Sequence, residues 1–363
     1  MKILVLKENN KSEARVAFTI DLAKKYNKLG FEINVEKDAG LGSSISNQDY
    51  IDAGVKICDN IDDILPSTDI IVSVQRSDID LAKIKKDVIF ISMLNPHFNK
   101  EAVDKLIKAG VKPFALEFVP RITRAQSMDV LSSQSNLAGY VSVLDAVSNM
   151  NKCVPMMMTA AGTVTAAKVM ILGAGVAGLQ AIATAKRLGA IVCAFDVRAA
   201  AKEQVKSLGA KFIEVESDDK DSETSGGYAK EMDDDYKKRQ QDLILETIKK
   251  QDIVISTALI PGKKAPILIT KEMVKVMKPG SVVSDLAAVN GGNCELTKIN
   301  EINEVDGVKI IGHENYPSLV SVDSSKLYSK NVYNFIELLV DKEKKEISIN
   351  LEDEILKASL IAN

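Results

Sequence analysis

Short apolar runs alternate along the first third of the chain with segments whose apolar residues recur at helical spacing. The runs are typical of buried strands, and the segments between them predict helices that end at glycine. Repeated strand–helix units of this kind predict a mostly parallel sheet covered by helices on both faces. The predicted strands are residues 3–6, 31–35, 55–58, 69–74, 88–92 and 111–116, and the predicted helices are 20–29, 49–53 and 100–109.

The same alternation continues through the second half of the chain. We therefore predict an α/β protein with two Rossmann-like, doubly wound parallel-sheet domains, joined by long helices and with a nucleotide cleft between them. The N-terminal domain is predicted to comprise residues 1–131 and, because the C-terminal segment is expected to return to it, residues 315–363. The second domain is predicted over 132–314. Its expected strands are 169–172, 190–196, 211–215, 252–257, 281–284 and 308–311, its expected helices are 179–188 and 205–208, and the C-terminal segment is expected to hold a helix at 324–340 and a strand at 346–351.

A long segment between the two blocks, residues 133–150, has few helix breakers. Its apolar residues follow the i, i+3, i+4, i+7 spacing of one helix face. We interpret it as an amphipathic helix that connects the domains, with a plain surface helix of either domain as the alternative. The predicted apolar face consists of Leu137, Tyr140, Val141, Leu144 and Val147.

Composition narrows the classes of protein that remain. The chain has 363 residues, 46% of them hydrophobic and 27% charged, which is typical of two folded domains of ordinary size. Its net charge of −3 is mixed along the sequence, so no basic surface indicates nucleic-acid binding. No apolar run approaches the roughly 20 residues that span a bilayer, and the N-terminus carries no signal-peptide pattern. Four scattered cysteines and two histidines predict neither a metal site nor a disulfide framework, and they favour the cytoplasm.

The most specific motif follows the strand predicted at 169–172. Gly173, Gly175 and Gly178 have the spacing G-x-G-x-x-G, a helical segment follows them, and Asp196 closes the next strand. In a dinucleotide site the glycines allow a tight turn, a close approach of the pyrophosphate and close helix–strand packing, while the acid accepts the ribose hydroxyls. The acid favours NAD(H) over NADP(H), although Arg198, two residues on, could soften that preference. The alternative is a glycine turn in an ordinary α/β protein.

A polar stretch, residues 216–241, interrupts the second domain with dense charge. Within it stand Gly226, Gly227 and Tyr228. One hypothesis is a mobile lid over about 217–240 that folds its tyrosine onto the bound nucleotide, and the alternative is a solvated loop.

A second stretch rich in hydrogen-bonding side chains, Pro120 to Tyr140, lies at the expected hinge between the domains. It is similar to the hinge loop of the NAD(H)-binding alpha subunit, domain I, of proton-translocating NAD(P)⁺ transhydrogenases. The resemblance covers nearly the whole chain and is carried further by residues 155–163, 175–190, 226–232, 257–263 and 291–294. Met156, Met157 and Met158 lie inside one of these strings, and we interpret them as core or interdomain packing.

The resemblance implies direct hydride transfer between NADH and NADP⁺, with NADP(H) held on a partner component. It also implies a homodimer, membrane-spanning partner subunits coupled to proton translocation, and a peripheral location on the inner face of the cytoplasmic membrane through those partners. The hinge-loop residues that it implies at the nicotinamide, and hence as catalytic, are Arg121, Gln126, Asp129 and Ser132. The expected cofactor-binding residues are Gly173, Gly175, Val176, Ala177, Gly178, Asp196, Val197, Arg198, Gly227, Tyr228, Ala258 and Leu259.

The same two-domain design resembles alanine dehydrogenase, which is the main alternative. By motif position, the lysine, histidine and aspartate that serve its substrate would fall at Gln75, Met93 and near Val289. Only its substrate arginine has a counterpart, Arg15, and His97 falls in the loop after Met93. Without these groups the chain is not expected to act on an amino acid. A non-catalytic regulator that binds NAD is a further alternative.

Overall fold

The computed structural model describes residues 1–76, 78–215, 234–260 and 262–361. It divides the chain into two compact units: unit 1 comprises Met1–Gln134 and Pro317–Asn363, and unit 2 comprises Ser135–Tyr316. The boundary falls inside helix α4 (Val130–Asn149). In the part of the chain that the structure describes, no helix is long and apolar enough to cross a membrane.

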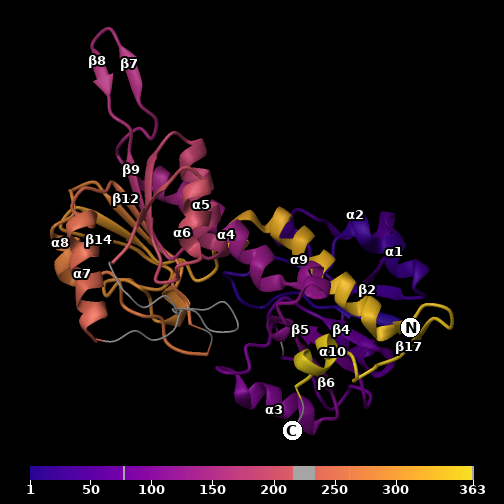
Figure 1. Cartoon of the computed structure of the whole chain (residues 1–363). Coiled ribbons are helices and arrows are strands. Elements are labelled where there is room, and N and C mark those ends of the chain that lie inside the picture. Colours follow the sequence, from indigo (N-terminus) through magenta and orange to yellow (C-terminus); the bar gives the residue numbers. More distant parts are fainter. Residues whose placement is uncertain (77, 216–233, 261, 362–363) are drawn as a thin grey trace. The chain divides into compact units, whose positions relative to one another are not determined.

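Unit 1 is built on a six-stranded parallel sheet in the order β3-β2-β1-β4-β5-β6 (Figure 1). The strands are short and buried, so apolar side chains alternate between two hydrophobic clusters, one on each face. Helices α1, α2, α9 and α10 contribute to one cluster and α3 to the other. The elements are β1 (Lys2–Val5), α1 (Ala23–Lys28), β2 (Glu32–Glu36), α2 (Asn47–Asp52), β3 (Lys56–Cys58), β4 (Ile70–Val72), β5 (Ile89–Ser92), α3 (Lys100–Lys108), β6 (Lys112–Ala115), α9 (Ser321–Ile336), β16 (Val340–Asp341), β17 (Glu346–Ile347) and α10 (Glu354–Ser359).

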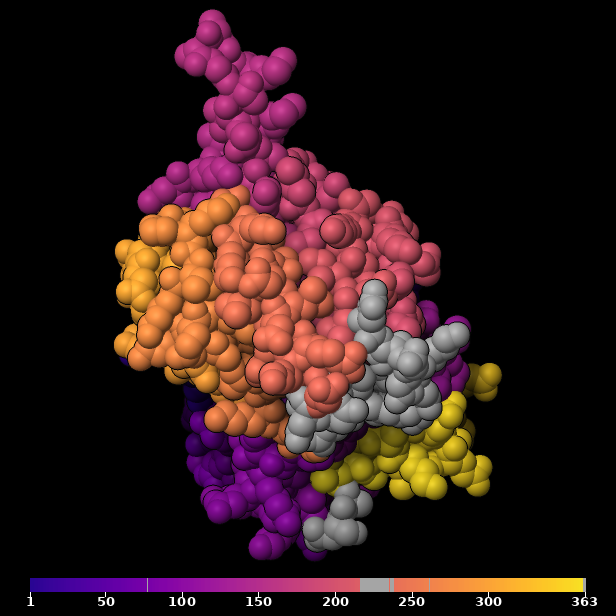
Figure 2. Space-filling model, turned by 60° about the vertical axis from the view of Figure 1, so that its left-hand side comes forward, coloured from indigo at the N-terminus to yellow at the C-terminus, as the bar shows by residue number. Residues whose placement is uncertain are grey.

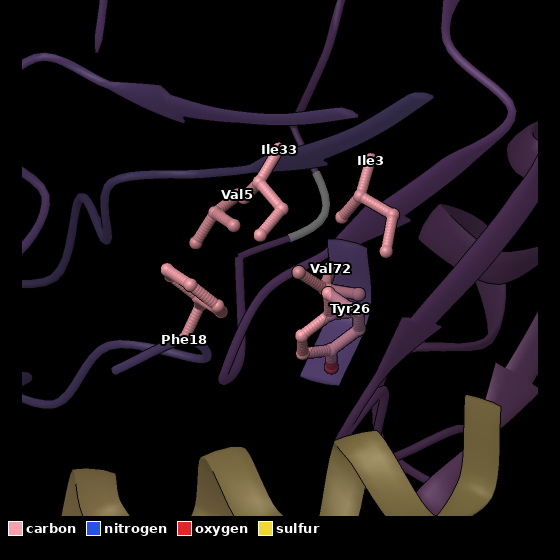
Figure 3. A pocket seen from close by; sticks show the side chains of 6 residues that line it. All are labelled: Ile3, Val5, Phe18, Tyr26, Ile33 and Val72. Carbon is pink, nitrogen blue, oxygen red and sulfur yellow. The ribbon is translucent and has the colours of Figure 1, made fainter. Parts of the chain in front are cut away.

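A small apolar pocket of unit 1 is core packing rather than a ligand site. Figure 3 shows side chains from β1, β2, β4 and α1 converging on it, together with Phe18. The space does not admit a water molecule. Its lining residues are Ile3, Val5, Phe18, Tyr26, Ile33 and Val72, and all six are buried.

Unit 2 contains a seven-stranded sheet in the order β11-β10-β9-β12-β13-β15-β14. Every pairing is parallel except β14 with β15, so the six parallel strands follow the doubly wound order of a dinucleotide-binding fold. Residues of α4, α5 and α6 cover one face, and residues of α7 and α8 cover the other. The elements are β7 (Met157–Thr159), β8 (Gly162–Val164), β9 (Lys168–Leu172), α5 (Val176–Arg187), β10 (Ile191–Phe195), α6 (Ala201–Ser207), β11 (Lys211–Ile213), α7 (Asp234–Ile248), β12 (Ile253–Ser256), α8 (Lys271–Lys275), β13 (Val282–Asp285), β14 (Ile302–Val305) and β15 (Val308–Ile311).

Two parallel sheets with helices on both faces confirm the predicted fold class. Three local expectations were wrong. The antiparallel strand β14 lies outside β15, which had been expected to complete the sheet. The predicted strand at 346–351 is only the two-residue β17, and α10 follows it. Helix α7 begins at Asp234, so the final part of the polar stretch is helical rather than loop.

The predicted face of α4 was also wrong. Tyr140 and Leu144 are 39% and 37% exposed, whereas Val143 and Ala146 are fully buried in the core of unit 2. Small residues allow this helix to approach its neighbours, so the largest apolar side chains do not mark its buried face.

The methionine run was expected in a core, and it is exposed instead. Met157 and Met158 lie in the antiparallel hairpin of β7 and β8, which stands clear of the rest of unit 2 in both Figure 1 and Figure 2. Met156 and Met158 are 62% and 79% exposed.

Candidate nucleotide-binding site

The glycine motif forms the turn from β9 into α5. Gly173 has a φ of +96°, which favours glycine, and a Cβ on Gly178 would stand 1.8 Å from the carbonyl oxygen of Gly173. A Cβ on Gly175 would meet nothing closer than an Arg198 nitrogen at 3.9 Å, so the backbone there is open to a ligand. Gly175 is the N-cap of α5 and has no side chain to cap the first N–H groups. These N–H groups and the helix dipole are suited to a phosphate.

A fourth glycine supports this turn from α4, and sequence reasoning gave it no role. A Cβ on Gly139 would lie 2.1 Å from the carbonyl oxygen of Ala177, in the first turn of α5. One turn earlier on α4, Asn136 Nδ2 lies 3.4 Å from Gln180 Oε1. Contact between helix backbones at this distance requires glycine, so α4 fixes the start of α5.

Three neighbouring strands end at one level and bring the predicted residues together. Leu172 of β9 pairs with Phe195 of β10 on one side and with Ser256 of β12 on the other. The glycine turn, Asp196 and the segment from Thr257 therefore follow these strands at the same edge of the sheet. This edge, where the strand order reverses, is where doubly wound folds bind ligands.

The carboxylate of Asp196 is surrounded by donors. Its Oδ2 accepts the Ala174 N–H at 2.7 Å, and its Oδ1 accepts the Arg198 N–H at 2.8 Å. Arg198 also donates Nε to Oδ1 and Nη2 to Oδ2, each at 2.9 Å, and both side chains are largely buried. Each carboxylate oxygen thus takes two hydrogen bonds, so a ribose hydroxyl would have to share or displace the contacts of Arg198.

The segment after β12 lies against the glycine turn. Thr257 Oγ1 donates to the carbonyl oxygen of Gly173 at 3.0 Å. The next residue, Ala258, is half-buried, and Leu259 is 45% exposed although it is apolar. An apolar side chain at this edge would gain burial by covering a nucleotide.

The residues predicted at the nicotinamide lie in unit 1, around the 3₁₀ helix η6 (Thr123–Met128). Arg121 and Gln126 are exposed, whereas Asp129 and Ser132 are half-buried and in contact. Asp129 Oδ1 accepts the Ser132 N–H at 2.8 Å, and its Oδ2 accepts the Ser132 hydroxyl. Asp129 directly precedes α4, so this geometry is that of a helix N-cap.

Three anchors of η6 were missed by sequence reasoning because they stand about 200 residues further along the chain. Asn331 and Asn334 of α9 both donate to the carbonyl oxygen of Ser127, at 2.8 and 2.9 Å. Arg124 forms a two-pronged ion pair with Asp353, at 2.7 and 2.9 Å. This pairing lowers the pKa of Asp353. The C-terminal segment thus holds η6 in place.

The positions that would serve an amino-acid substrate are unsuited to one. Arg15 is 3% exposed, and its guanidinium pairs with Glu13 at 2.6 Å and donates to Gln134 Oε1 at 2.8 Å. An arginine neutralised in this way is not available to a substrate carboxylate. Gln75 is exposed and Met93 packs against the core. Val289 is 52% exposed.

An unusual carboxyl group lies beside Gln75. Glu8 accepts the N–H groups of Val74, Gln75 and Arg76 at 2.7, 3.2 and 2.9 Å. Burial nevertheless dominates and raises the pKa of Glu8 to about 7, with a further increase from the charge of Glu13.

Two of the expected cofactor-binding residues, Gly227 and Tyr228, lie outside the residues that the structure describes, as does the expected lid up to Asp234. Val176, Ala177 and Val197 lie beside the glycine turn and after β10, where the sequence motif puts them.

A parallel sheet of this strand order, with a glycine turn and a closing acid at its switch point, defines a Rossmann-type dinucleotide-binding protein. The chain belongs to the alanine dehydrogenase/PNT family. The N-terminal domain of that family matches residues 4–138, and its C-terminal domain matches residues 142–363. Membership implies that the chain binds a nicotinamide nucleotide.

Individual relatives separate the two branches of the family. An NAD(P) transhydrogenase subunit alpha of Rhodospirillum rubrum is 49% identical over 368 residues, which cover 99% of this chain and 96% of the relative. The solved structure of transhydrogenase from Sinorhizobium meliloti has a TM-score of 0.89 at 47% identity and covers 99% of this chain and 98% of its own. Alanine dehydrogenase 1 of Staphylococcus aureus is more distant, at 30% identity over 94% of this chain and 88% of the relative. The resemblance to transhydrogenase is confirmed.

Proposed function

We propose that this chain is the NAD(H)-binding alpha component of a proton-translocating NAD(P)⁺ transhydrogenase. It binds NADH at the glycine turn of unit 2, and the hydride passes directly to NADP⁺ held on a partner component. The observation that carries the proposal is the acid-closed glycine turn, in a chain that matches a transhydrogenase subunit along 99% of its length at 49% identity. Coupling to protons belongs to membrane-spanning partner subunits, which would hold this chain at the inner face of the cytoplasmic membrane.

The chemistry requires little from the protein beyond position. A hydride moves between two nicotinamide rings without proton transfer to a substrate oxygen or nitrogen, so no general acid or base is needed. Arg121, Gln126, Asp129 and Ser132 are proposed to hold the nicotinamide end through donors and acceptors for its carboxamide and ribose. Asp129 and Ser132 support each other through two hydrogen bonds, which would fix that part of the site.

The test is reconstitution of hydride transfer. The purified chain is mixed with an NADP(H)-binding component of a transhydrogenase, and reduction of an NADP⁺ analogue by NADH is followed by absorbance. We expect transfer in the mixture and none with either protein alone. A mixture without transfer would refute the proposal. Oxidation of NADH by this chain with pyruvate and ammonia would instead establish alanine dehydrogenase chemistry, against which the buried Arg15–Glu13 pair argues.

A homodimer is part of the proposal, and the hairpin of β7 and β8 supports it. Met158 at 79% exposure and Met156 at 62% are large apolar side chains on a projecting arm, and a second copy of the chain would cover them. Sedimentation equilibrium should give a dimer for the parent chain and a weaker dimer for Met158→Asp. Lys168→Asp, an exposed change at the start of β9, serves as the control. A monomeric parent chain would contradict the assembly.

A further inference from the structure

A buried asparagine outside the dinucleotide motif holds the segment that follows β12. Asn293 is fully buried, and its Oδ1 accepts the Ala258 N–H at 3.0 Å while its Nδ2 donates to the Ala258 carbonyl oxygen at 2.9 Å. The same Nδ2 donates to the carbonyl oxygen of Pro266 at 2.8 Å. One side chain therefore takes both polar groups of Ala258, as a neighbouring strand would.

Asn293 is itself fixed by a buried carboxylate. Asp285, at the end of β13, accepts the N–H groups of Asn293 and Cys294 through Oδ2, at 2.8 and 3.0 Å. The Thr297 hydroxyl donates to the same oxygen at 2.6 Å, and the Ala287 N–H donates to Oδ1 at 2.9 Å. The backbone around Asn293 is thus held to β13 on one side, and its side chain reaches the end of β12 on the other.

The strand order indicates which part of a dinucleotide this would affect. Strand β10, which carries Asp196 at its end, lies on one side of β9, and β12 lies on the other. A dinucleotide crosses such a sheet at the switch point, with one mononucleotide half over each side. Since Asp196 is placed to take the adenosine ribose, the segment at Ala258 and Leu259 is beside the nicotinamide half.

We propose that Asn293 is a positioning residue, which fixes the backbone of Ala258 and the exposed side chain of Leu259 to receive the nicotinamide half of NADH. This inference rests on the proposed function, because it requires NADH at the glycine turn. Asn293 does not touch the nucleotide in this role. It acts through Ala258, just as outer groups act through the direct ligands of a metal site.

The test compares NADH with ADP, which has only the adenosine half. Binding of both to the full chain is measured by isothermal titration calorimetry for the parent and for Asn293→Asp, which keeps an acceptor for the Ala258 N–H but loses both donated hydrogen bonds. We expect the Kd of NADH to rise by about tenfold or more, the scale on which outer groups act on a site. The Kd of ADP should stay within about twofold, because groups that share no partner act independently.

Asn293→Ser, which adds no charge, provides a second variant if the buried carboxylate prevents folding. Asn303→Asp is the matched control, since Asn303 also donates Nδ2 to a carbonyl oxygen, that of Leu296 at 3.1 Å, elsewhere in unit 2. It should leave the ratio of the two Kd values unchanged. Equal losses of NADH and ADP in the Asn293 variants, or no loss of NADH, would overturn the inference. An Asp196→Asn chain that still binds both ligands as the parent does would refute the nucleotide site, and the inference with it.

Discussion

Replacement of Asp196 by asparagine tests whether this carboxylate selects the nucleotide. Asparagine keeps the size of the side chain but removes its charge and one of its two acceptor oxygens. In the parent, those oxygens accept the N–H groups of Ala174 and Arg198 and the guanidinium of Arg198. The substitution therefore weakens the contacts to the ribose and, at the same time, releases Arg198 from its ion pair.

The magnitude follows from these contacts. A hydrogen bond to a charged group contributes about 1.5–3 kcal/mol. NADH must exchange hydrogen bonds with Arg198 rather than gain them outright, so we expect the lower value and a rise in its Kd of about tenfold. NADPH behaves differently, because the released guanidinium can pair with its 2′-phosphate in place of the lost repulsion. Its Kd should stay constant or fall, and the preference for NADH should narrow by about tenfold or more.

Fluorescence titration measures both affinities directly, because the chain contains no tryptophan to interfere with the reduced nicotinamide signal. Asp252→Asn is the matched control. Asp252 is similarly paired, with Lys152 at 3.0 Å, but it directly precedes β12 and so lies at the opposite edge of the sheet. The control should keep both Kd values. A parent-like ratio of NADPH to NADH affinity in Asp196→Asn would refute the role given to the acid.

Three further predictions address the rest of the site and the stability of unit 1. Gln126→Asn should slow hydride transfer in the reconstituted mixture by far more than it weakens NADH binding, whereas equal losses in rate and affinity would argue for simple binding. Gly139→Ala should lower the free energy of unfolding by about 1–3 kcal/mol through overpacking against Ala177, although glycine to alanine within a helix ordinarily stabilises by about 1 kcal/mol; an unfolding temperature at or above that of the parent would contradict this. Because burial raises the pKa of Glu8 from 4.5 to about 7, the folded chain binds more protons between these values, so stability should fall as pH rises through this window, by up to about 3 kcal/mol. Urea unfolding should show this slope for the parent and not for Glu8→Gln, and a slope common to both chains would assign it to another group.

The sequence predicted most of the strands because each is a short apolar run buried on both faces. It failed where packing depends on something other than apolar content. Strand β14 alternates half-buried and exposed residues at the sheet edge, and α4 meets its neighbours through Gly139, Val143 and Ala146 rather than through Tyr140 and Leu144. The exposed methionines of the hairpin show the same limit, since an apolar run does not reveal whether its own chain covers it.

The candidate site divides along a similar line. Motif spacing located the glycine turn and Asp196 because these residues are close in sequence and their geometry is local. It could not locate Asn293 at Ala258, Asp353 at Arg124, or Gly139 at Ala177, because these contacts join segments far apart in sequence. The roles of Gln126 and its neighbours at the nicotinamide stay predictions.

Loss of a substrate site and retention of a nucleotide site are two separate changes, and unit 1 shows how the first can be complete. The retained arginine of an amino-acid site could have kept a weak affinity for carboxylates. Instead Glu13, two residues before it, takes Nε and Nη2 of Arg15, and Gln134 takes Nη1. A carboxylate would have to displace a buried partner of the same charge, and stranding a buried charge costs several kcal/mol. Unit 2 meanwhile keeps every local feature of a dinucleotide turn. Such a chain can bind a reduced nicotinamide but offers no proton donor for an imine or carbonyl at the described positions of an amino-acid site, so a second nicotinamide, held by a partner, is the acceptor whose chemistry fits.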